Sequence, residues 1–341
     1  MRRSLIALAL IAALVVGPLG QQTGRAQSEQ IYLALGDSIP AGLLASLPAE
    51  RGYPGLLHQL IEAERLAQDE PANVELINLS EPGETVQSFL SDGQLDDAID
   101  EIEAAPNDSI GTVTLTLGGN NILSLWESTA AERQDELDEF EAQFASVIDE
   151  LSDAVAGHDA DVIVTTYYDL TEGDPDVEGS NAWWLRQFNE VISETAGDAG
   201  FDVVDLESIF RGRVTELTWF PADVHPNNAG HQAIARVIWE ELSYDQEPPE
   251  IEITRPDDGE VRSRVPTVHA SVSDNVEVED VRLESPDGDS VELLYVPDLD
   301  AWVGIWDARG YPDTEAELTV VATDVSGNES RESVTIRLPS A

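Results

Sequence analysis

The sequence predicts an α/β part with a parallel sheet covered by helices on both faces, followed by a smaller all-β part. From residue 31 to about residue 242, short apolar runs alternate with longer amphipathic runs, which is typical of such sheets. A polar linker with two prolines follows at residues 244–249. After it, short alternating segments are separated by turn clusters without any helical pattern, and this predicts a β-sandwich.

Runs of apolar and β-branched residues predict the strands of the first part. In chain order they are Ile31–Leu35, Val74–Ile77, Val113–Leu117, Val162–Thr166 and Phe201–Val204. Apolar residues spaced three or four apart predict helices between and after them, at Leu56–Ile61, Ala130–Leu151, Trp184–Thr195 and Ala229–Leu242. The second part is predicted to have strands at Ile251–Ile253, Val268–Val272, Val281–Leu283, Leu318–Ala322 and Val334–Ile336. Ligands of open parallel sheets bind beyond the carboxyl ends of the strands, so the chemistry is expected there.

The composition excludes several classes of function. The chain has 17 Lys+Arg, all of them Arg, against 68 Asp+Glu, for a net charge of −51. Nucleic acid is excluded as a partner, because no basic surface is available to neutralise phosphates. The absence of Cys excludes disulfides, zinc–thiolate sites and a cysteine nucleophile. The acidic, Lys-free composition fits equally well a protein adapted to high salt or a genome that prefers Arg codons.

The N-terminus is typical of a secretory signal peptide. Two Arg precede an apolar run from Leu5 to Val16, which is too short to span a membrane. Small residues at Gly24 and Ala26 predict cleavage after Ala26. We therefore expect residues 1–26 to be a signal peptide and the protein to be secreted, without stable membrane insertion. The alternative is an uncleaved N-terminal anchor.

Two segments carry groups suited to nucleophilic catalysis. Gly36-Asp37-Ser38 directly follows the first strand, and a helix beginning there would aim backbone N–H groups at the same edge of the sheet. Asp223-Val224-His225 precedes the last helix, and in an extended segment residues two apart face the same side. An acid beside an imidazole fixes its tautomer and stabilises its protonated form. Taken alone, a helix cap and a loop histidine are the more ordinary interpretations.

Two further segments place hydrogen-bond donors at the same edge. Gly83 lies in the loop after the second strand, and Asn120 follows the third. The Gly83 N–H and the Asn120 amide can donate to an oxyanion, although a turn glycine and a helix-cap asparagine are ordinary alternatives.

Together the four segments resemble the SGNH (GDSL-type) hydrolase family over about residues 31–242. The matching blocks are Gly36-Asp37-Ser38, Gly83 within Glu81–Thr85, Gly118-x-Asn120, and Asp223-x-His225. Two positions depart from the family pattern. The family usually places two residues between its acid and histidine, and it often has Asp where Asn121 stands.

The resemblance implies a flavodoxin-like three-layer α/β/α sandwich and a serine ester hydrolase. It implies Ser38 as the nucleophile, His225 as the base and Asp223 as the acid that orients it. The Ser38 N–H, the Gly83 N–H and the Asn120 amide would form the oxyanion hole. No cofactor and no catalytic metal are expected, and the substrate would be a small-molecule, lipid or polysaccharide ester.

The C-terminal part resembles a bacterial immunoglobulin-like domain, on Pro248–Ile253, Ser273-Asp274-Asn275 and Ala322–Asn328. Such modules usually space or attach secreted enzymes, so contact with a cell surface or a glycan stays open. Asp274, Asp324 and Asn328 are suitable calcium ligands, but the sequence lacks EF-hand spacing and turn acids are the more ordinary interpretation.

The expected organisation is a signal peptide at residues 1–26, a hydrolase domain at 27–245 and a β-sandwich domain at 246–341. The second hypothesis for the whole chain is a secreted, non-catalytic protein that binds a glycan or a cell surface.

Overall fold

A computed structural model of the chain describes residues 30–68, 73–106, 109–259 and 263–340. The signal peptide predicted at residues 1–26 lies outside the described residues. Within these ranges, no helix has both the length and the apolar character needed to cross a membrane.

The first part contains a five-stranded parallel sheet. Its strands are β1 (Gln30–Gly36), β2 (Val74–Asn78), β3 (Ile110–Thr116), β4 (Asp161–Thr165) and β5 (Asp202–Val204). They lie in the order β2-β1-β3-β4-β5, which is the flavodoxin-like order. The predicted fold class of this part is therefore confirmed.

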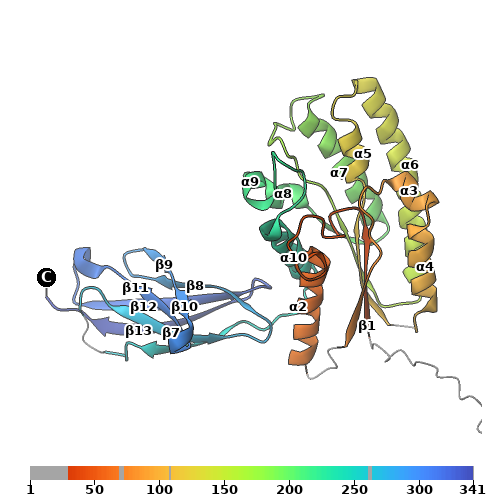
Figure 1. The fold of residues 1–341 in the computed structure, drawn as a ribbon. Coiled ribbons are helices and arrows are strands. Elements are labelled where there is room, and N and C mark those ends of the chain that lie inside the picture. Colours follow the sequence, from red (N-terminus) through yellow and green to blue (C-terminus); the bar gives the residue numbers. More distant parts are fainter. Residues whose placement is uncertain (1–29, 69–72, 107–108, 260–262, 341) are drawn as a thin grey trace, which may run out of the picture.

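Helices cover both faces of the sheet (Figure 1). On one face α2 (Tyr53–Ala67) packs against α10 (Asn228–Leu242). On the other face α6 (Ala130–Val155) contacts α3 (Val86–Ser91), α4 (Gln94–Ala104) and α7 (Asn181–Asp198). Short helices lie in the connections that follow β1, β3 and β5: α1 (Pro48–Arg51), α5 (Gly119–Ser124), α8 (Leu206–Phe210) and α9 (Val214–Leu217).

Helix α6 shows how the sequence builds the core. A capping box at Thr129 and Glu132 begins it, because each side chain accepts a hydrogen bond from the backbone N–H of the other residue. Its apolar residues recur every three or four positions, so one face is buried. On that face the Phe140 ring stacks on Phe144 and meets the edge of Phe188 from α7, with centroids 5.4 and 5.1 Å apart.

The C-terminal part consists of antiparallel strands, as predicted. One sheet has the order β10-β11-β7-β6 and the other β13-β12-β8-β9. The strands are β6 (Glu250–Arg255), β7 (Thr267–Ser273), β8 (Val278–Glu284), β9 (Ser290–Glu292), β10 (Leu294–Val296), β11 (Ala301–Ile305), β12 (Glu315–Asp324) and β13 (Glu329–Arg337), with 3₁₀ turns at Pro297–Leu299 and Ala308–Gly310. Side chains from both sheets, Val268 and Leu318 among them, form a second core with Trp306, which follows β11. This is consistent with the immunoglobulin-like sandwich expected.

The two parts are joined by polar and apolar contacts. The buried Trp239 of α10 donates from Nε1 to Ser326 Oγ over 2.7 Å, and Ser326 Oγ donates to Asp245. Val276 and Val325, from the C-terminal part, pack on the core of the first part. The predicted domain boundary, between residues 245 and 246, falls in the segment that links α10 to β6.

Candidate active site

Ser38 lies just beyond the carboxyl end of β1. Gly36 ends this strand with φ of +123°, and a Cβ there would lie 1.9 Å from the backbone oxygen of Thr116 in β3. Glycine therefore allows the chain to leave the sheet against the end of the neighbouring strand. The helix considered after Ser38 is not formed, because residues 38–44 make turns and α1 begins only at Pro48.

The structure brings Ser38, His225 and Asp223 together. His225 Nε2 lies 2.8 Å from Ser38 Oγ, and His225 Nδ1 lies 2.5 Å from Asp223 Oδ1. Ser38 is 7% exposed, and the His225 side chain is also largely covered, at 16%. Ser38 and Asp223 thus each lie within hydrogen-bonding distance of a different ring nitrogen of His225, which is the geometry that a serine triad requires.

A turn, and not an extended segment, places Asp223 beside His225. Asp223 Oδ1 accepts the backbone N–H of His225 at 3.0 Å as well as the ring contact. This local turn lets an acid and a histidine separated by one residue meet, and it corrects the extended geometry assumed from the sequence. Burial raises the pKa of Asp223, but the hydrogen bonds from His225 outweigh it and lower the pKa overall. Asp223 therefore stays ionised beside the imidazole.

The segment around His225 is held on both sides. The Trp219 N–H donates to the His225 carbonyl over 3.0 Å, and the Tyr168 hydroxyl donates to the Val224 carbonyl over 2.9 Å. Asn227 then caps α10 by accepting from the N–H groups of Ala229 and Gly230. The imidazole is thereby fixed between a strand-end loop and a helix N-terminus.

The three predicted oxyanion donors lie in neighbouring segments. The Asn120 side chain donates to the Glu84 carbonyl over 2.8 Å, which ties it to the turn that contains Gly83. The same turn reaches the end of β1, since the Glu81 N–H donates to the Gly36 carbonyl over 3.0 Å. Within the described parts of the chain, no acceptor is found for the N–H groups of Ser38 and Gly83. These two donors are available to a ligand.

The Asp37 side chain, which precedes Ser38 in the chain, is buried and hydrogen-bonded. Its carboxylate is 2% exposed, and it accepts the Tyr167 hydroxyl over 2.6 Å and the Ile39 N–H over 2.9 Å. Burial raises the pKa of Asp37 to about 6, and the two hydrogen bonds only partly offset that effect. The sequence analysis gave Asp37 no role beyond its place in the motif.

Two further supports escaped the sequence analysis. Gln94, at the start of α4, clasps the Gly36 peptide by accepting its N–H over 2.8 Å and donating to its carbonyl over 3.1 Å. It also donates to the buried Glu84 carboxylate over 2.8 Å. Asn121, at the position where the family often has Asp, accepts the Val86 N–H and donates to Glu136 over 3.0 Å. The amide suits this chain because an Asp there would face the Glu136 carboxylate.

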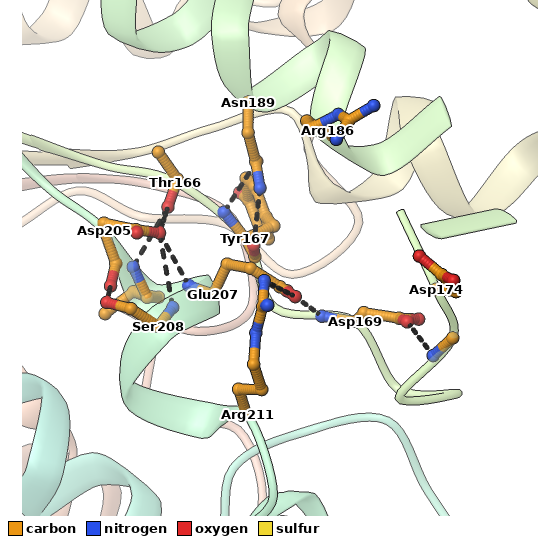
Figure 2. A network of polar contacts seen from close by, with 12 residues as sticks. Thr166, Tyr167, Asp169, Asp174, Arg186, Asn189, Asp205, Glu207, Ser208 and Arg211 are labelled. Atoms are coloured by element: carbon orange, nitrogen blue, oxygen red, sulfur yellow. Dashed lines mark hydrogen bonds and ion pairs between the residues drawn. The ribbon is translucent and has the colours of Figure 1, made fainter. Parts of the chain in front are cut away.

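The loop after β4 is fixed by the network in Figure 2. Asn189 of α7 accepts the Tyr167 N–H over 3.0 Å and donates to the Tyr167 carbonyl over 2.8 Å. Glu207 accepts the Asp169 N–H over 2.6 Å and pairs with Arg211 over 3.2 Å. The loop is consequently held from two helices, α7 and α8.

A pocket opens beside Ser38 and His225. It encloses about 800 Å³, its open mouth included, and lies among α5, the start of α6, the loop after β4, and α7. Most of its surface is apolar, and Trp184 contributes to it.

With this geometry in place, comparison with known proteins gives the family. Residues 34–233, more than half of the chain, match the GDSL-like Lipase/Acylhydrolase family. The chain belongs to this family. The match confirms the resemblance found in the sequence, and membership makes the protein a carboxylic ester hydrolase. A search of curated proteins found no match.

Several solved structures are similar to the first part. The acetylxylan esterase Axe2 from Geobacillus stearothermophilus is 20% identical with a TM-score of 0.50, and the match covers 64% of this chain and 96% of that one. The acetylxylan esterase AlAXEase is 20% identical over 62% of this chain and 99% of that one, with a TM-score of 0.46. LAE5, an α/β hydrolase enzyme from the metagenome of Lake Arreo, is 19% identical over 64% and 98%, with a TM-score of 0.48. At such identities, the likeness to Axe2 establishes the fold.

Among the described residues, the carboxylates close enough to share a cation are those of Asp245, Asp274 and Asp324, whose ligand atoms lie within 4.8 Å of one another. The cluster includes two residues considered as calcium ligands from the sequence. It lies where the two parts of the chain meet, near Tyr244, whose hydroxyl donates to Asp161 at the start of β4. This is the edge of the sheet opposite Ser38, so the cluster takes no part in the candidate active site.

Proposed function

We propose that the enzyme cleaves carboxylic esters through a Ser38–His225–Asp223 triad and an acyl-enzyme. His225 Nε2 takes the Ser38 proton as Oγ bonds to the ester carbonyl carbon, and the developing oxyanion accepts from the N–H groups of Ser38 and Gly83 and from the Asn120 amide. The imidazolium, stabilised by Asp223, then gives its proton to the leaving alcohol as the acyl–alkoxy bond breaks. Water, deprotonated by His225, releases the acid and restores Ser38.

The observation that carries this proposal is the continuous contact from Asp223 Oδ1 through both ring nitrogens of His225 to Ser38 Oγ, at 2.5 and 2.8 Å. The N–H groups of Ser38 and Gly83, for which no acceptor is found among the described residues, are the proposed oxyanion donors. A serine is a weak nucleophile unless a base activates it, and this arrangement supplies the base, its orienting acid and the oxyanion donors.

The proposed substrate is a neutral ester, on a small molecule, a lipid or a polysaccharide. With a net charge of −51, the protein repels anionic substrates at low salt. The polysaccharide class is supported by the acetylxylan esterases that share the fold. We also propose that the protein is secreted, on the strength of residues 1–26.

Two measurements test the proposal. The first is hydrolysis of p-nitrophenyl acetate and of acetylated xylan at low and molar salt, and the second is covalent labelling by a fluorophosphonate. Ser38→Ala should lose turnover and labelling while keeping its circular dichroism spectrum. Ser91→Ala, which removes an exposed hydroxyl on α3, should keep both. Activity that survives in Ser38→Ala would refute the nucleophile, and a folded wild-type protein that neither turns over nor labels would favour the non-catalytic binding hypothesis.

A further inference from the structure

We propose that the pocket beside Ser38 binds the acyl chain of the ester, so that the enzyme prefers medium-chain acyl esters to acetyl esters. This inference rests on the proposed function and specifies its substrate class. Ser38 and His225 line the same pocket, so the carbonyl carbon of a bound ester must sit at its mouth. An acetyl group, which has a single methyl beyond its carbonyl carbon, would leave most of the lining side chains without contact.

The walls of the pocket are suited to a hydrocarbon. Leu125 contributes from the end of α5, Leu170 from the loop after β4, and Trp184, Leu185 and Phe188 from one face of α7. The last three side chains are at most 7% exposed, so they are fixed by packing. Apolar walls of this kind stabilise an apolar ligand by removing its surface from water.

Several polar groups in the same walls already have partners. The hydroxyls of Tyr167 and Tyr168 donate to Asp37 and to the Val224 carbonyl. Both carboxylate oxygens of Asp169 accept hydrogen bonds from its own loop, at Thr171 and Gly173. These groups are therefore not free to bind a sugar, whereas Arg133 Nε, in the same lining, has no hydrogen-bond partner among the described residues. The preference for an acyl chain accordingly rests on the apolar side chains of the walls.

The pocket is formed before a ligand enters. Figure 2 shows Asn189 and Glu207 fixing the backbone of the loop that carries Tyr167 to Leu170. On the opposite side, Arg133 is 8% exposed and donates to the Trp126 carbonyl over 2.9 Å, which fixes the chain after α5. A preformed apolar pocket loses little conformational entropy on binding.

The mouth of the pocket is also apolar. Leu123 and Trp126 both line the pocket and are 37% and 40% exposed. Exposed large apolar side chains next to a catalytic serine extend the apolar surface outward, where a longer chain would continue. The net charge of −51 disfavours anionic amphiphiles relative to neutral esters.

The test measures kcat/KM for p-nitrophenyl acetate, butyrate, hexanoate and octanoate, in which the alcohol part is constant. Each methylene moved from water into the pocket contributes about 0.8 kcal/mol, or about a fourfold gain. We expect kcat/KM to rise by about tenfold or more from acetate to octanoate, because only part of the chain needs to be buried. A value that stays constant or falls with chain length would overturn the inference.

Variants of the pocket residues test whether the preference for longer acyl chains arises in this pocket. Trp126→Ala removes a half-exposed wall residue and should lower kcat/KM for octanoate by about fivefold to thirtyfold, with acetate changed by less than about twofold. Tyr295→Ala, which removes a similarly exposed aromatic from β10, is the matched control and should change neither. Leu185→Trp fills the pocket and should reduce octanoate turnover while acetate turnover persists.

The outcomes separate this inference from the proposed function. If acetate is hydrolysed and Ser38→Ala is inactive, the triad stands whatever the chain-length profile. If Trp126→Ala and Leu185→Trp lower kcat/KM equally for every acyl length, the pocket holds the alcohol part and the acyl assignment is wrong. If no ester is hydrolysed by the folded wild-type protein, the proposed function fails and the acyl pocket with it.

Discussion

Asp37→Asn should change how the stability of the α/β part depends on pH. Burial raises the pKa of Asp37 from 3.8 to about 6. The folded state therefore holds this proton more tightly than the unfolded chain does. The stabilisation of the folded state by the protonated Asp37 carboxyl is fully present below about pH 4 and is lost as the pH rises through about 6. The difference between the two pKa values corresponds to about 3 kcal/mol, because each pH unit is worth about 1.4 kcal/mol.

Asparagine stays neutral at every pH, so Asp37→Asn removes this dependence. It also loses one acceptor, since only one of its two terminal atoms can accept from Tyr167 or Ile39. That loss costs about 1–3 kcal/mol at all pH values. We therefore expect the free energy of unfolding of the variant, relative to wild type, to rise by about 3 kcal/mol between about pH 4 and pH 8.

Urea unfolding at a series of pH values measures this difference. Pulse proteolysis reports the α/β part separately from the C-terminal strands, which matters because a chain of two parts need not unfold in one step. Molar salt screens the general repulsion among the acids but leaves the burial of Asp37 unchanged. Asp298→Asn corrects for the loss of one carboxylate. Parallel curves for Asp37→Asn and wild type would refute the conclusion that burial raises the pKa of Asp37.

Other changes test the surroundings of Ser38. Asn120→Ala should raise the barrier of acylation by about 2–4 kcal/mol, as for other oxyanion donors, and an unchanged kcat would remove Asn120 from the oxyanion hole. Asn121→Asp places a second carboxylate beside Glu136 and should destabilise the α/β part by about 1–3 kcal/mol at neutral pH, while Asn121→Asp with Glu136→Gln should recover most of that loss. Gly36→Ala puts a Cβ onto the Thr116 carbonyl and should lower both thermal stability and kcat; a variant as active and stable as wild type would contradict the close approach.

The sequence predicted those features whose signal is local. Parallel strands buried on both faces appear as continuous apolar runs, and six of the seven residues of β1 are buried. Ser38 and His225, which lie together in the structure, could be proposed from the sequence because each lies next to a strand end or a helix start within a short motif. Asp223 could be proposed for the same reason, since it contacts His225 within one turn.

Features that depend on distant partners were not predicted. Gln94 forms its hydrogen bond with Gly36, 58 residues away, and Tyr167 forms its hydrogen bond with Asp37, 130 residues away. The sequence next to Gln94 or Tyr167 therefore does not indicate these contacts. Helix α4 was also not predicted, although Leu95, Ala98 and Ile102 recur at helical spacing on its buried face.

The C-terminal part has three strands, β9, β10 and β11, that the sequence analysis did not predict. β9 and β10 have three residues each, too short for an alternating pattern to stand out. β11 contains Gly304, which weakens a strand pattern. The reason for this glycine is tertiary, because a Cβ there would lie 2.7 Å from a methyl group of Leu293.

The junction between the two parts decides which way the enzyme faces. Tyr244 reaches the first residue of β4 through its hydroxyl, and Asn275 donates to Glu64 near the end of α2, so the C-terminal strands attach at the amino-terminal edge of the parallel sheet. Ser38 opens at the other edge, which in Figure 1 lies toward α5 and away from the C-terminus. An enzyme fixed to a bead or a matrix by its C-terminus would thus present its mouth to the surrounding liquid, where bulky esters can approach and both products can diffuse away.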